Sequence, residues 1–115
     1  MMRKSVCVAG LAVMIAMLLT AWPIVMAKAQ QPSAIIEVKI DNFSFGPQAP
    51  TVAAGTTVTW TNRDDIPHTV VSVDGVFKSK VLDTDEKFSY TFATAGTFSY
   101  FCSIHPKMTG KIVVQ

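Results

Sequence analysis

The chain has 115 residues and a formal net charge of +2. Three basic residues before position 30 account for this excess, because residues 30–115 contain seven basic and eight acidic side chains. Basic patches interleaved with aromatic residues are missing from the sequence, so we expect no nucleic-acid partner. Cys102 is the only cysteine after position 30, which excludes a disulfide within that part of the chain.

The first 29 residues have the pattern of a secretory signal peptide. Arg3 and Lys4 precede an apolar stretch over residues 6–26, and Ala27-Lys28-Ala29 resembles a small-residue cleavage site. An uncleaved membrane anchor is the alternative, because the apolar stretch is long enough to span a bilayer. We predict cleavage after residue 29, export to the periplasm and no membrane insertion of the mature protein. Residues 30–115 are then one small domain with a single core.

Apolar and polar residues alternate at period two along most of this domain, which is typical of half-buried β-strands. We predict strands over residues 36–41, 43–45, 57–61, 68–73, 88–92, 97–101 and 111–114. The pair Asp74-Gly75 is expected to form a turn. No stretch of the domain shows a helical period. Short strands separated by Gly, Pro, Asn and Asp predict an all-β fold, either a small β-sandwich or a barrel.

Four residues of the domain offer donors that suit a soft metal ion. Cys102, His105 and Met108 lie within one turn-sized loop, and His68 is the only other histidine. Alone, each has an ordinary explanation, such as a buried cysteine, a gap-filling methionine or a loop histidine. Two imidazoles and a thiolate in a plane, with a weak axial thioether, form the ligand set of a type 1 blue-copper site. We predict that these four residues bind one copper ion.

Four protein ligands leave no open position for a substrate, whereas catalytic metal sites keep one. The pattern therefore favours an electron carrier over an enzyme. A periplasmic copper carrier or buffer is the alternative, although Pro67 and Pro106 stiffen the chain next to the two histidines and disfavour metal exchange. A nucleophilic enzyme that uses Cys102 and His105 would leave the methionine and the upstream histidine without a role.

Residues 34–115 resemble the cupredoxin family, most closely the amicyanins and more broadly the plastocyanins and pseudoazurins. The matching segments are residues 57–63, 67–68, 95–102, 105–106 and 108–111. The short Cys-x₂-His-x₂-Met spacing is that of the amicyanins. The resemblance implies a Greek-key β-sandwich and periplasmic electron transfer through one type 1 copper held by His68, Cys102, His105 and Met108.

The expected partners are redox proteins, such as a donor dehydrogenase or cytochrome and an acceptor cytochrome or oxidase, and the protein is expected to be a monomer. They would dock near His105, on a small apolar patch formed by Ile66, Pro67, Ile104 and Pro106. Thr69 and Ser103 follow ligand residues directly. Each either donates hydrogen bonds to the ligand loop or the thiolate, or is an ordinary strand or turn residue, and the sequence leaves both open.

Overall fold

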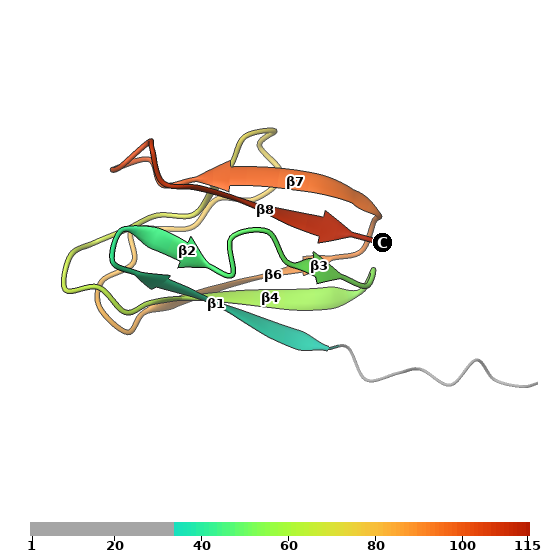
Figure 1. The fold of residues 1–115 in the computed structure, drawn as a ribbon, viewed down its shortest axis with the longest axis horizontal. Coiled ribbons are helices and arrows are strands. Elements are labelled where there is room, and N and C mark those ends of the chain that lie inside the picture. The colour runs from blue at the N-terminus through green and yellow to red at the C-terminus, as the bar shows by residue number, and fades with distance from the viewer. Residues whose placement is uncertain (1–33) are drawn as a thin grey trace, which may run out of the picture.

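The computed structural model describes residues 34–115, which form two packed four-stranded β-sheets (Figure 1). The predicted signal peptide over residues 1–29 lies outside the described residues. The first sheet has the order β2 (Ser44–Gly46), β1 (Ile35–Asp41), β4 (Thr56–Asn62), β6 (Lys87–Phe92). The second has the order β3 (Thr51–Val52), β8 (Thr109–Val114), β7 (Gly96–Phe101), β5 (Val71–Ser72).

Residues 34–115 contain no helix, so the predicted all-β Greek-key sandwich is confirmed. Accordingly, none of the elements in this region could cross a membrane as an apolar helix. The sheets mix pairing directions: β1 runs parallel to β4 and antiparallel to β2, and β3 runs parallel to β8. Period-two alternation did not reveal these directions, because it reports which face of a strand is buried and not which strand lies beside it.

The buried faces of the strands meet in one hydrophobic core. Val38 and Ile40 of β1 are fully buried, and Val38 lies opposite Trp60 of β4. The Trp60 ring lies 5.4 Å from the Tyr100 ring and 5.5 Å from the Phe77 ring, measured between centroids. Because aromatic side chains bury large areas and prefer such offset or edge-on contacts, this cluster joins the two sheets.

Two predicted strands are wrong in part. The run over residues 68–73 forms a ladder only at Val71–Ser72, while His68 makes an isolated bridge to Leu82. The backbone of Val70 bonds instead to Ser79, whose hydroxyl and N–H replace a neighbouring strand. The segment 43–45 begins one residue later than predicted, because positive φ angles at Asn42 and Phe43 turn the chain between β1 and β2.

Three connections gather at one end of the sandwich: the β1–β2 turn, the segment after β4, and the β7–β8 loop (Figure 1). Hydrogen bonds join the segment after β4 to both of the others. Asp64 accepts from the β1–β2 turn, and Thr69 contacts Cys102 and Ser103 of the β7–β8 loop. The predicted ligands therefore come together from segments that lie far apart in the sequence.

Candidate metal centre

Three of the four predicted ligands converge on one point. The Sγ atom of Cys102 lies 3.7 Å from Nδ1 of His68 and 3.8 Å from Nδ1 of His105, and the donor atoms of the three residues all lie within 4.8 Å of one another. His68 and Cys102 are fully buried, whereas His105 is half-buried. Two imidazole nitrogens and one sulfur around a shared centre form a trigonal donor set that fits copper.

The fourth predicted ligand, Met108, is fixed to the same loop by its backbone. The N–H of Cys102 donates to the Met108 carbonyl at 3.1 Å, and the N–H of Met108 donates to the His105 carbonyl at 2.9 Å. The Met108 side chain is buried, with 6% of the residue exposed. The loop that carries the thiolate thus also sets the position of the thioether, whose weak donor character suits an axial ligand.

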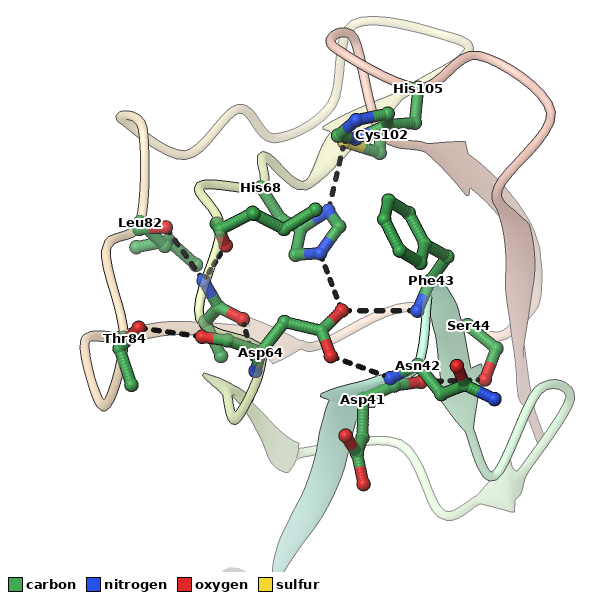
Figure 2. Close-up of polar contacts among 12 residues, drawn as sticks. Asp41, Asn42, Phe43, Ser44, Asp64, His68, Leu82, Thr84, Cys102 and His105 are labelled. Carbon is green, nitrogen blue, oxygen red and sulfur yellow. Dashed lines mark hydrogen bonds and ion pairs between the residues drawn. The ribbon is translucent and has the colours of Figure 1, made fainter.

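Sequence reasoning missed Asp64, which lies beneath His68 (Figure 2). Its Oδ2 atom lies 2.7 Å from Nε2 of His68. A carboxylate can only accept at this distance, so the imidazole carries a proton on Nε2 and turns Nδ1 toward Cys102. Metal-binding histidines are commonly oriented in this way by a carboxylate on the second nitrogen. The signal available in the sequence was an acidic residue four positions before a predicted ligand.

The Asp64 carboxylate also holds the β1–β2 turn. Its two oxygens accept the backbone N–H groups of Asn42 at 2.7 Å and Phe43 at 3.0 Å. These bonds lower the pKa of Asp64 below its usual value, against the opposing effect of burial, and the contact with His68 lowers it further. The backbone of Asp64 is fixed as well, because the Thr84 hydroxyl donates to the backbone carbonyl of Asp64 at 2.6 Å.

The Phe43 ring lies beside the imidazole ring of His68 and also contacts that of His105 (Figure 2). Its ring makes edge-on contacts with His68 at 5.7 Å and with His105 at 5.2 Å between centroids. About half of the residue is exposed, at 52%. The sequence pattern placed Phe43 in a strand, but its positive φ of 56° turns it out of the sheet and onto the site. Phe43 thus forms an apolar cover between the two histidines and solvent.

The groups around Cys102 favour the thiolate form of its side chain. Burial alone would raise the pKa of its thiol, but the Thr69 N–H at 3.4 Å and the two imidazoles outweigh burial and lower it to about 6. A thiolate is the form that binds metal ions. Cys102 is a free cysteine, as expected for the part of the chain that the structure describes.

Comparison with known proteins agrees with this geometry. The sequence profile described as "Cupredoxin-like domain" matches residues 10–114. Amicyanin from Paracoccus denitrificans is 37% identical over 94 residues, which cover 77% of this chain and 72% of that protein. The chain belongs to the cupredoxin family. The predicted resemblance to cupredoxins, and to amicyanins among them, is therefore confirmed.

Solved structures place this cupredoxin with the same group. The Cu(I) form of an amicyanin variant matches with a TM-score of 0.68 at 37% identity, covering 76% of this chain and 88% of that one. A purple cupredoxin from Nitrosopumilus maritimus matches with a TM-score of 0.65 at 33% identity, covering 70% and 99%.

Proposed function

We propose that this cupredoxin is a type 1 blue-copper electron carrier of the periplasm. One copper ion would be held by His68, Cys102, His105 and Met108, and would supply a one-electron couple between Cu(II) and Cu(I). The observation that carries the proposal is the convergence of two Nδ1 atoms and one Sγ atom at the end of the sandwich. The copper-containing amicyanin structure among its relatives supports the choice of metal.

The residues around the site favour electron transfer because they resist movement. Asp64 fixes the ring of His68, and the Thr69 N–H fixes the Cys102 sulfur. Backbone bonds within the β7–β8 loop fix His105 and Met108 relative to each other. A donor set that keeps its geometry suits both oxidation states, so little reorganisation accompanies the transfer of an electron.

His105 is the ligand through which we expect the electron to leave. It is half-buried, whereas His68 is fully buried. Of the predicted docking patch, Pro67, Ile104 and Pro106 are exposed and Ile66 is half-buried. A small apolar surface of this kind suits the short-lived encounters of redox proteins, whether with a dehydrogenase, a cytochrome or an oxidase. The proposal also includes that residues 1–29 are a signal peptide that directs export and that the exported protein is a monomer.

A copper carrier or buffer would use the same donors but would have to release the ion. The test is to load the protein with Cu(II) and cycle it between ascorbate and ferricyanide in the presence of a copper chelator. An electron carrier is expected to pass through repeated cycles with its copper retained. Transfer of copper to the chelator during the cycles would contradict the proposal and favour the carrier. Cys102→Ser, which removes the thiolate, serves as the variant expected to lose copper.

A further inference from the structure

Two hydroxyl groups lie beside the Cys102 sulfur. Oγ1 of Thr69 is 3.8 Å from Sγ of Cys102, 2.7 Å from the backbone nitrogen of Ser103 and 2.7 Å from Oγ of Ser103. Thr69 is buried, with 5% exposed, whereas Ser103 is exposed. Thr69 therefore has to satisfy its hydroxyl with these three neighbours, while Ser103 also has access to water.

Counting protons limits the possible arrangements. A hydroxyl has one proton to donate and two lone pairs that accept. The N–H of Ser103 donates to one lone pair of Thr69. In one arrangement, the Ser103 hydroxyl donates to the second lone pair, and the Thr69 proton is left for Cys102. In the other, Thr69 donates to the Ser103 hydroxyl, and both the sulfur and the second lone pair of Thr69 lose a partner.

Burial and charge decide between the two arrangements. Hydrogen bonds to ionised acceptors are roughly twice as strong as neutral ones, and Cys102 is fully buried, so an ionised sulfur there would have no access to water. The exposed Ser103 oxygen can accept from water instead. The first arrangement also leaves no lone pair of the buried Thr69 unpaired, and buried polar groups without partners are costly.

We propose that the Thr69 hydroxyl donates to the Cys102 thiolate, as a second hydrogen bond beside the Thr69 N–H, and that the backbone N–H of Ser103 holds the Thr69 oxygen in place. Thr69 is then a positioning residue that draws electron density from the sulfur. Because hydrogen bonding around the cysteine sulfur tunes the potential of such sites, the second bond stabilises the reduced form. This consequence for the potential rests on the proposed copper function, whereas the hydrogen bond does not.

The potential of the copper-loaded variants tests the proposal. Thr69→Val keeps the shape and removes the hydroxyl, so its Cu(I)-to-Cu(II) ratio at a fixed applied potential is expected to fall about tenfold. For a one-electron couple this equals a drop of about 59 mV. Thr69→Ser keeps the hydroxyl and is the matched control, with a potential close to that of the unmodified protein. A Thr69→Val potential equal to that of Thr69→Ser would overturn the proposal.

Ser103→Ala separates the two arrangements. If Thr69 already donates to the sulfur, removing the Ser103 hydroxyl leaves that bond in place and the potential nearly unchanged. If Thr69 donates to Ser103, the freed proton turns to the sulfur and the potential rises. A rise would therefore contradict the proposed direction of the bond.

A measurement without copper keeps this inference apart from the proposed function. In proton NMR spectra of the reduced, metal-free protein, the buried Thr69 hydroxyl is expected to give a slowly exchanging signal that persists in Ser103→Ala. Persistence of the signal in a protein that forms no blue copper site would support the hydrogen bond and contradict the proposed function. Loss of the signal in Ser103→Ala, or a large change in its chemical shift, would contradict the hydrogen bond, whatever the copper site does.

Discussion

Asp64 and His68 are joined by a 2.7 Å contact between Oδ2 and Nε2, and this contact fixes which imidazole nitrogen faces the metal centre. The same carboxylate accepts two N–H groups of the β1–β2 turn, which carries Phe43. One side chain thus links a fully buried ligand to the residue that covers it. The first prediction follows from the loss of these bonds.

Replacing Asp64 by Asn is expected to lower the free energy of unfolding of the metal-free protein by about 2–3 kcal/mol, because an amide cannot accept from all three donors. The potential of the copper-loaded variant is expected to rise, because a carboxylate increases the basicity of His68 and so favours Cu(II). Urea unfolding and voltammetry measure the two effects. Asp65→Asn, at the exposed neighbouring position, is the control for net charge. Equal results for both variants would show that only charge matters.

The pH dependence of stability also reports on Asp64. Its pKa lies below the usual 3.8, chiefly because the Phe43 N–H, His68 and the Asn42 N–H outweigh burial. A carboxyl whose pKa is lowered by folding adds stability above its unfolded pKa and loses it as the pH falls through the folded pKa. We expect Asp64→Asn to flatten the acid side of the stability curve of the metal-free protein below about pH 4. An unchanged acid limb would contradict this role.

Phe43→Ala is expected to weaken copper retention as well as the fold. The variant removes the edge-on contacts with His68 and His105, each worth about 0.5–1.5 kcal/mol beyond area burial, and opens the covered side of the site. Copper transfer to a chelator should therefore become faster. Phe98→Ala is the control. Phe98 lies on β7, four residues before Cys102, and its ring contacts Phe92. Its removal should reduce stability without speeding copper loss. Equal copper retention in both variants would refute the covering role.

Gly110→Ala is expected to destabilise the fold by about 1–3 kcal/mol. A Cβ atom at this position would lie 2.5 Å from the Cζ atom of the Tyr100 ring and 2.5 Å from its hydroxyl oxygen. The Tyr100 ring cannot move aside, because it is fully buried against Phe45 and Trp60. Gly46→Ala is the matched control, since its Cβ would meet nothing closer than 4.0 Å. Urea unfolding of the two variants measures the difference, and equal stabilities would contradict the packing argument.

Because of the buried Tyr100, we expect the free energy of unfolding to fall at alkaline pH. Burial raises its pKa from 10.0 to about 12, despite the opposing effect of the nearby Trp60 side chain. A group whose pKa is raised by folding adds stability below its unfolded pKa and loses it as the pH rises through the folded pKa. Between pH 10 and 12 the protein should lose about 3 kcal/mol from this source. In Tyr100→Phe this loss should disappear, and a curve unchanged by the substitution would contradict the account.

The longer strands with one buried face were predictable, whereas the two-residue strand β3 (Thr51–Val52) was missed because it is too short to show an alternation. The alternation around Val58 and Trp60 gave β4, and the Cys-x₂-His-x₂-Met spacing gave the ligand loop. Residues 68–73 misled the prediction, because β-branched residues favour a strand whether or not a neighbouring strand is present. Here Val70 bonds to Ser79 in place of a strand.

Asp64 and Phe43 escaped prediction for a related reason. Their roles depend on three segments meeting at one end of the sandwich, and neither composition nor periodicity reports such a meeting. Asp64 stands between two other charged residues in the sequence, as in an ordinary polar loop, and Phe43 fitted the alternation of the predicted strand 43–45. Only the packed fold brings the carboxylate to His68 and the ring to His105.

The central claim is that two histidines, one thiolate and one thioether form a type 1 copper site. The most direct test is to add Cu(II) to the purified protein and record its visible and EPR spectra, with Cys102→Ser as the reference. We predict an intense blue sulfur-to-copper absorption with narrow copper hyperfine splitting, which the variant lacks. A pale protein with a wide, square-planar type of copper signal, identical in the variant, would contradict the account.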